Sequence, residues 1–297
     1  MRAAYPQRLR PLRALGIVVA VLTGIALTGC ASLDLGDVLV IAQKSAPAVQ
    51  KSFEDITPEQ EYYIGRAVGA TILAQYSPYT EPGPTEYLNL LGRTLAFASD
   101  RPETFGGYHF LILDSQEINA FAAPGGLIFV SRGLLACADS EDRVAAILAH
   151  EIAHVVEQHG LQAIKKSRVS SALTSVAIAS AQTAGSDELA KLTTVFEDSI
   201  GDITSTLVNS GYSRAFEKEA DLMAVEILKR VGYDPNALVR MLEVMEKRLT
   251  PGGLDFAKTH PEPEVRIGEI RKVLPYAPAP PVQTARQIRY QAALGNI

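Results

Sequence analysis

The chain of 297 residues is long enough for one large domain or two small ones, and 47% hydrophobic residues is ample for a buried core. Its formal net charge is −5, but the first 29 residues contain four arginines and no acid, which leaves 24 of the 28 basic residues against 33 acidic ones. The rest of the chain is therefore acidic. This balance argues against a surface that holds phosphates, and nucleic acid is not an expected partner.

The N-terminus has the layout of a bacterial export signal. A basic stretch ends at Arg13, and the apolar run 14–27 that follows is short for a membrane span, which needs ~20 apolar residues. The run leads into Leu27-Thr28-Gly29-Cys30, which resembles the lipobox at which a cysteine is lipidated and becomes the mature N-terminus. We expect a signal peptide over residues 1–29 and a lipid anchor at Cys30. Ordinary cleavage and an uncleaved anchor are the alternatives.

The residue after Cys30 bears on location. It is Ala31 and not an aspartate, which by resemblance to the sorting rule of enterobacteria favours the outer membrane, with the protein on the periplasmic side. Residues 30–56 are then a lipidated N-terminus and tether. Cys137 is the only other cysteine, so no intramolecular disulfide is expected, and its apolar neighbours predict a buried thiol.

Helical patterns dominate the rest of the chain. Thr57-Pro58-Glu59-Gln60 carries a cap, a proline suited to the first helical position and a capping-box glutamine, and it predicts a helix to about Gln75. Residues 169–184 are too polar and too short to span a membrane. Further helices are expected at 85–98, 212–231, 236–249 and 262–274. After a domain over 57–274, residues 275–297 are expected to form a proline-rich C-terminal tail, in which residues 276–281 are an extended linker followed by a short tail.

Strands are expected between the second and third of these helices. Apolar runs at 108–113 and 126–130 predict two of them, with Pro124-Gly125 as a turn. Residues 119–123 are either an edge strand that aligns substrate or an ordinary hairpin strand. Asp139 or Ser140 then caps a helix through His159, and its apolar residues occupy so much of the circumference that the helix must be buried.

The buried helix contains His150-Glu151-Ile152-Ala153-His154. At 3.6 residues per turn both imidazoles lie on one face and can reach a single tetrahedral zinc ion, while Glu151 can accept a proton from water at the metal. Satisfied core histidines are the alternative. Two imidazoles and a carboxylate are costly inside an apolar helix unless they share a task, which favours the metal site.

A catalytic zinc requires a third protein ligand. His159 lies about 140° round the helix from His154, so it is expected to point elsewhere and to be a C-terminal helix residue favoured by the helix dipole. Glu217 and Asp221 share a helical face, so Glu217 could bind the metal while Asp221 accepts an imidazole N–H. Spacing alone does not decide whether Glu217 or Glu219 is the third ligand. The alternative is a run of charged residues that faces solvent and binds no metal.

Five motifs in order resemble the HtpX-like and CAAX-prenyl-endopeptidase group of zinc metallopeptidases, in particular its periplasmic lipoprotein members. They are Ile118 to Gly126, His150 to His159, Tyr212-Ser213-Arg214, Glu217 to Asp221, and Thr259-His260-Pro261 with Arg266-Ile267. The resemblance covers about residues 57–274 and implies an α+β fold, a mainly helical gluzincin-type domain with a small sheet. It also implies Glu217 as third ligand and one Zn²⁺ per chain. No transmembrane helix after the signal and no C-terminal repeat domain is evident, so the partners of those relatives are not carried over.

The expected function is zinc-dependent cleavage of misfolded envelope proteins, with Glu151 as general base. Tyr212, Arg214 and His260 are candidates for stabilising the oxyanion, and the sequence does not choose among them. By resemblance His260 lies near the metal, where it could alternatively occupy the fourth position. An outer-membrane assembly or chaperone lipoprotein that uses the zinc fold for partner binding is the competing hypothesis, and an intact Glu151 argues against it.

Overall fold

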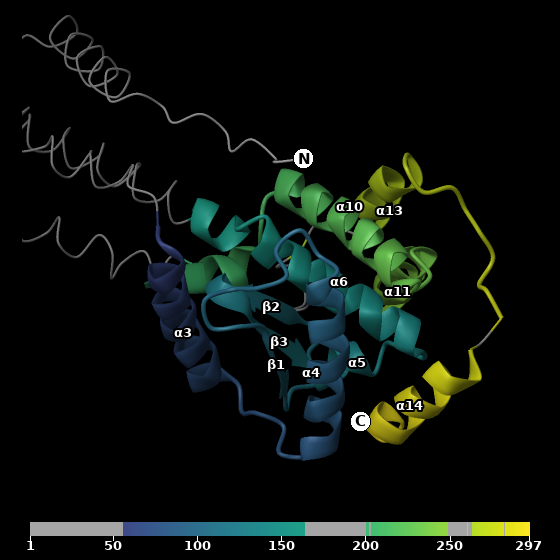
Figure 1. Ribbon diagram of the computed structural model, residues 1–297, viewed down its shortest axis with the longest axis horizontal. Helices are drawn as coiled ribbons and strands as arrows, with labels where there is room; N and C mark the ends of the chain where they lie inside the picture. Colours follow the sequence, from purple (N-terminus) through teal and green to yellow (C-terminus); the bar gives the residue numbers. More distant parts are fainter. Residues whose placement is uncertain (1–55, 164–199, 202, 249–259, 261–262, 282) are drawn as a thin grey trace, which may run out of the picture. The chain divides into compact units, whose positions relative to one another are not determined.

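A three-stranded sheet lies at the centre of the part of the chain that the computed structural model describes (Figure 1). That part comprises residues 56–163, 200–201, 203–248, 260, 263–281 and 283–297, all within one structural unit. The expectations for the signal peptide, for Cys30 and for residues 169–184 lie outside it. Among the described helices, none combines the length and the apolar composition needed to cross a membrane.

The sheet has the strand order β1-β3-β2. Strand β1 (His109–Leu113) runs parallel to β3 (Leu127–Ser131), and β2 (Ala120–Ala123) runs antiparallel to β3. A short 3-10 turn, Pro124–Gly126, joins β2 to β3, and its two glycines have φ of 79° and 99°, which favour glycine. Both strands expected from apolar runs are therefore present, and residues 119–123 contain an edge strand of this sheet.

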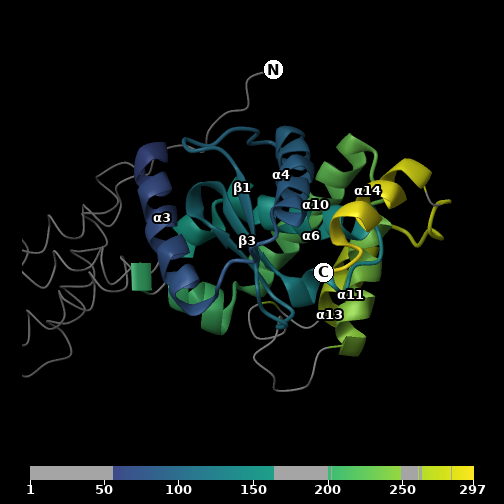
Figure 2. The same ribbon diagram turned by 90° about the horizontal axis from the view of Figure 1, so that it is seen from below.

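Helix α3 (Pro58–Gln75) covers one face of the sheet (Figure 2). It starts with the expected capping box between Thr57 and Gln60. A Cβ on Gly65 would lie 1.8 Å from the carbonyl oxygen of Pro124, so only glycine allows the helix to approach the turn this closely. Buried Glu61 accepts from the Gly125 N–H at 3.0 Å and pairs with Arg101 at 2.6 Å, which fixes the turn that ends β2.

The other face of the sheet carries the larger core. Helices α4, α6, α10, α11, α13 and α14 contribute to it, and the buried residues of α6 include every position from Val144 to Val155. The helices on this side are α4 (Pro82–Phe97), α5 (Arg132–Leu135), α6 (Glu141–Val156), α10 (Arg214–Val231), α11 (Asn236–Arg248), α13 (Pro263–Arg271) and α14 (Thr284–Leu294). The α+β class with mainly helical content is confirmed, as is the burial of the helix that carries the two histidines.

One expected helix end was wrong, and one helix was not expected. The helix expected to continue through His159 ends at Val156, because Gln158 adopts a left-handed φ of 55° and interrupts it. The linker at 276–281 is extended as expected. The tail after it forms α14, whose residues Tyr290 and Leu294 are buried against the core.

The two edges of the sheet differ in the partners of their outward backbone groups. On the outer edge of β1, the Asn89 side chain accepts from the Phe110 N–H at 3.1 Å and donates to its carbonyl at 2.7 Å, and the Tyr79 N–H donates to Ile112. Asn89 thus takes the place of a neighbouring strand. On β2, pairing of Asn119 with Ser131 directs the polar backbone groups of Ala122 away from β3, and no backbone partner for them is present among the described residues.

Candidate metal centre

Helix α6 presents two imidazoles to one point. His150 and His154 are one turn apart, are 2% and 1% exposed, and have their Nε2 atoms 3.2 Å from each other. The surrounding turns are apolar because this helix is packed between the sheet and α10. Two buried ring nitrogens directed at the same point are the arrangement expected of two ligands to one metal ion.

Helix α10 brings a carboxylate to the same point. Its cap, Ser213, accepts a hydrogen bond from the backbone N–H of Phe216, and Glu217 follows in the first turn, 1% exposed. The Glu217 oxygens lie 3.5 Å from Nε2 of His150 and 3.4 Å from Nε2 of His154. His260 joins from the segment before α13, with Nδ1 2.8 Å from Glu217. One donor atom from each of the four residues lies within 4.8 Å of all the others.

These distances suit a zinc ion. Ligand bonds of 2.0–2.1 Å in a tetrahedron place neighbouring donor atoms roughly 3.3–3.4 Å apart, close to the three separations between His150, His154 and Glu217. Oε1 of Glu217 is buried, and no hydrogen-bond donor to it is found among the described residues. Two imidazoles, one carboxylate and a further position near His260 form the donor set of a catalytic zinc site.

The charges of the cluster favour a cation. Burial and Arg266 lower the pKa of His150, but hydrogen bonds to Asp221 and Glu217 outweigh them and raise it to about 9. Burial lowers the pKa of His154 to about 3. Burial also opposes ionisation of Glu217, yet the neighbouring histidines hold its pKa well below the usual value. The cluster therefore retains an ionised carboxylate next to a protonated His150, and a metal ion can replace that proton.

His150 is held from behind by a carboxylate. Its Nδ1 lies 3.0 Å from Asp221, one turn after Glu217 on α10. Asp221 in turn accepts two hydrogen bonds from Arg266 of α13, at 3.0 and 2.6 Å. Arg266 is 3% exposed, so its charge balances two buried carboxylates. Sequence reasoning gave Arg266 no role, because an arginine in an amphipathic helix usually faces solvent.

His159 does not point away from the site, contrary to the sequence analysis. The left-handed Gln158 folds the chain back, and Nδ1 of His159 lies 2.9 Å from Nδ1 of His154. Its Nε2 lies 3.2 Å from Glu219. The helical-wheel argument was wrong for His159 because it assumed a helix that continues past Val156. Glu219, half-exposed, faces His159 and not the cluster, and Lys218 pairs with Glu269 on the surface.

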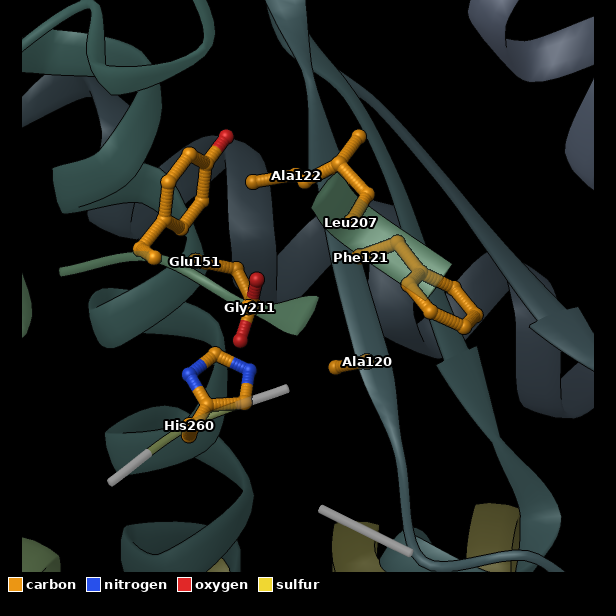
Figure 3. A pocket seen from close by; sticks show the side chains of 8 residues that line it. Ala120, Phe121, Ala122, Glu151, Leu207, Gly211 and His260 are labelled. Carbon is orange, nitrogen blue, oxygen red and sulfur yellow. The ribbon is translucent and has the colours of Figure 1, made fainter. Parts of the chain in front are cut away.

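Glu151 lies in a small cavity beside the cluster. The cavity has a volume of about 10 Å³, room for at most one water molecule. Figure 3 shows the carboxylate of Glu151 next to the ring of His260, with the edge strand that carries Ala120 and Ala122 to one side. Burial raises the pKa of Glu151, which makes it a stronger base than an exposed glutamate. The cavity is lined by Ala120, Phe121, Ala122, Glu151, Leu207, Gly211, Tyr212 and His260.

Of the three oxyanion candidates, two line this cavity. The ring of Tyr212 stacks on the ring of His154 with centres 4.5 Å apart. Its hydroxyl is buried and has no hydrogen-bond partner in the described part of the chain. Burial, and then the charge of Glu151, raises the pKa of Tyr212, so the hydroxyl keeps its proton. His260 is the second. Arg214 is exposed at the start of α10 and does not line the cavity.

An HExxH helix, a glutamate from α10 and a buried glutamate beside them define a zinc metallopeptidase. Residues 82–274 match peptidase family M48. The chain belongs to that family, whose members are zinc-dependent, and the resemblance noted from the sequence is confirmed.

Relatives in bacteria and yeast support the assignment. The chain is 30% identical to the "Beta-barrel assembly-enhancing protease" of Escherichia coli K12 over 71% of its own length and 42% of that protein. It is 30% identical to the "Putative beta-barrel assembly-enhancing protease" of Vibrio cholerae, over 82% and 49%. It is 28% identical to the "Mitochondrial metalloendopeptidase OMA1" of Schizosaccharomyces pombe, over 77% and 65%. The chain thus spans about half the length of these bacterial relatives.

Proposed function

We propose that this protein is a zinc-dependent endopeptidase of the bacterial cell envelope that cleaves misfolded proteins. The observation that carries the proposal is the position of Glu151, buried in the cavity next to three metal-ligand side chains. A site that only held zinc would need His150, His154 and Glu217 and no buried base. The carboxylate of Glu151 beside the cluster therefore supports catalysis over a purely structural role.

In the proposed reaction, a bound Zn²⁺ supplies Lewis acidity to the attacking water and to the scissile carbonyl. His150, His154 and Glu217 hold it. The Glu151 carboxylate accepts the proton of the attacking water as its oxygen bonds to the carbonyl carbon. Glu151 then passes this proton to the amide nitrogen as the carbon–nitrogen bond breaks. The hydroxyl of Tyr212, which has no hydrogen-bond partner among the residues that the structure describes, is available to donate to the substrate, and His260 is the alternative donor.

We propose that the substrate binds as an added strand along β2. The pairing of the two edges supports this arrangement. The N–H and C=O of Ala122 face away from β3 and have no backbone partner in the described part of the chain, while Asn89 blocks the opposite edge of the sheet. Leu207 and His260 also line the cavity, so an extended peptide requires at least one of them to move.

Substrates from the envelope are the expected class. The relatives in E. coli and V. cholerae are named for β-barrel assembly, and a lipid anchor at Cys30 would hold this chain on the periplasmic side of the outer membrane. A chaperone role in assembly is the second candidate, favoured by the same names. Loss of cleavage without loss of binding in a Glu151 variant separates the two.

The decisive experiment compares Glu151→Gln with the native chain on an unfolded outer-membrane protein. We expect zinc content to stay at one per chain and cleavage to fall about 10²- to 10⁴-fold, since the ligands remain and the base is lost. Exposed Glu246→Gln on α11 is the control and should cleave normally. If Glu151→Gln lost zinc to the same extent as cleavage, Glu151 would be a metal ligand. Undiminished cleavage would refute the mechanism.

The anchor is tested separately by Cys30→Ala. One residue supplies the whole lipid attachment, so the variant should be unlipidated and should leave the outer-membrane fraction. Fractionation in the absence of detergent measures this directly. Unchanged membrane association would refute the lipobox assignment without affecting the proposed peptidase activity.

A further inference from the structure

We propose that His159 and Glu219 form a positioning relay that holds the ring of His154 in the tautomer and orientation required of a metal ligand. The inference rests on the proposed function, namely that His150, His154 and Glu217 bind zinc. Nδ1 of His154 lies 2.9 Å from Nδ1 of His159, whose Nε2 lies 3.2 Å from Glu219. His159 is fully buried, and Glu219 is 54% exposed in its side chain. The relay therefore runs from the metal cluster to the protein surface.

The direction of the hydrogen bonds follows from the role of His154. Its Nε2 can bind a cation only through a lone pair, so the proton of the neutral ring is on Nδ1. Nδ1–H of His154 must then donate to Nδ1 of His159, which acts as the acceptor. The neutral His159 ring carries its proton on Nε2 and donates it to the Glu219 carboxylate. The hydrogen bond to His159 thus fixes the tautomer of His154, and the hydrogen bond to Glu219 fixes the tautomer of His159.

The ring of His159 is held in place by packing. It stacks on Phe216 with ring centres 4.4 Å apart and planes 12° from parallel. Phe216 directly precedes Glu217, so one turn of α10 supplies a metal ligand, the stacking partner of His159 and, at Glu219, the end of the relay. The left-handed Gln158 turns the chain so that His159 faces this turn.

The other ligand histidine has a simpler support. His150 contacts Asp221 directly at 3.0 Å, and Asp221 is 1% exposed. Nδ1 of His154 instead faces the imidazole of His159, which lies between it and the surface carboxylate of Glu219. His159 itself is not in the group of four possible ligands, because its two ring nitrogens face His154 and Glu219.

The test separates hydrogen bonding from packing at position 159. His159→Phe retains an aromatic ring to stack on Phe216 but offers no acceptor, whereas His159→Gln retains an amide oxygen as acceptor. We expect His159→Phe to weaken zinc binding about 10- to 100-fold in competition with a chelator and to change the visible spectrum of the Co²⁺-substituted protein. His159→Gln should bind zinc within about threefold of the native chain. A His159→Phe protein with native zinc affinity and native Co²⁺ spectrum overturns the relay.

The outer end of the relay gives a second, gentler test if His159→Phe fails to fold. Glu219→Ala should weaken zinc binding about 3- to 10-fold, and Glu219→Gln, which keeps an acceptor, should weaken it less. Glu226→Ala is the matched control, since Glu226 is on the same helix with a 53% exposed side chain. Equal affinities of the Glu219→Ala and Glu226→Ala proteins overturn the relay. A native chain that binds no zinc, or Glu217→Ala without effect, would instead refute the proposed metal site.

Discussion

His260 is the residue whose role most affects the resting state of the site. Its ring is buried, its Nδ1 lies 2.8 Å from Glu217, and it lines the cavity beside Glu151. His260 precedes a proline, which favours an extended backbone at that position. From this position it can either fill the fourth position at the metal or donate to the substrate carbonyl.

We predict that His260→Ala retains zinc and raises basal proteolysis several-fold, including self-cleavage, because water gains access to the fourth position. Zinc content and cleavage of an unfolded protein measure the outcome. A lower turnover number with zinc retained would assign His260 to transition-state stabilisation. If neither quantity changes, His260 has no role in the site.

Residue spacing predicted part of this centre and missed the rest for identifiable reasons. The pair His150 and His154 follows from helical periodicity alone. Glu217 and Glu219 could not be separated by spacing, and contacts between α10 and α6 put Glu217 in the cluster and Glu219 against His159. The position of His159 depends on one left-handed residue, Gln158, and a glutamine gives no signal for that conformation.

At the scale of elements, the sheet assigns different tasks to its two edges. The Asn89 side chain satisfies the outer backbone groups of Phe110 in β1, so that edge cannot accept a further strand. Ala122 in β2 lines the cavity that holds Glu151, and its outward backbone groups have no backbone partner among the described residues. This unpaired edge, although buried, lies next to a buried base, which supports strand addition as the mode of substrate binding.

We predict that Ala122→Pro lowers kcat/KM about 5- to 10-fold with zinc retained. Proline removes the outward N–H, and one hydrogen bond contributes about 1 kcal/mol. The ladder with β3 is spared, since Ala122 is not in a hydrogen-bonded pair with that strand. Ala122→Ser keeps the N–H and serves as the control. Equal activity of the two variants would argue against substrate pairing at Ala122.

Apolar periodicity predicted the existence and order of the elements on both sides of the site. The capping box at Thr57 marked the start of α3, and the apolar runs marked β1 and β3. The end of α6 and the presence of α14 were missed. Proline-rich sequence before α14 resembles a linker, and only two residues of that helix, Tyr290 and Leu294, are buried by tertiary packing.

For the whole molecule, α14 links the end of the chain to the beginning of the metal-binding helix. Arg289 bonds to buried Glu141, and Arg286 pairs with Asp142, both in the first turn of α6. The Tyr290 hydroxyl donates to the carbonyl of Ala138 at 2.8 Å. The start of the helix that carries His150 and His154 is therefore held by contacts with a segment some 140 residues away in sequence.

The consequence is that α14 and the peptidase core should unfold together. Leu294 is 2% exposed, and Leu294→Ala should lower the free energy of unfolding by about 2–5 kcal/mol through lost burial and the cavity left behind. Ile288 lies on the same helix at 63% exposure, and Ile288→Ala should change stability by no more than about 0.5 kcal/mol. Thermal denaturation of the apo-protein, followed by circular dichroism, gives both values without a contribution from bound zinc. If Leu294→Ala leaves the main transition in place, α14 unfolds on its own, and its contacts with Glu141 and Asp142 do not support the metal-binding helix.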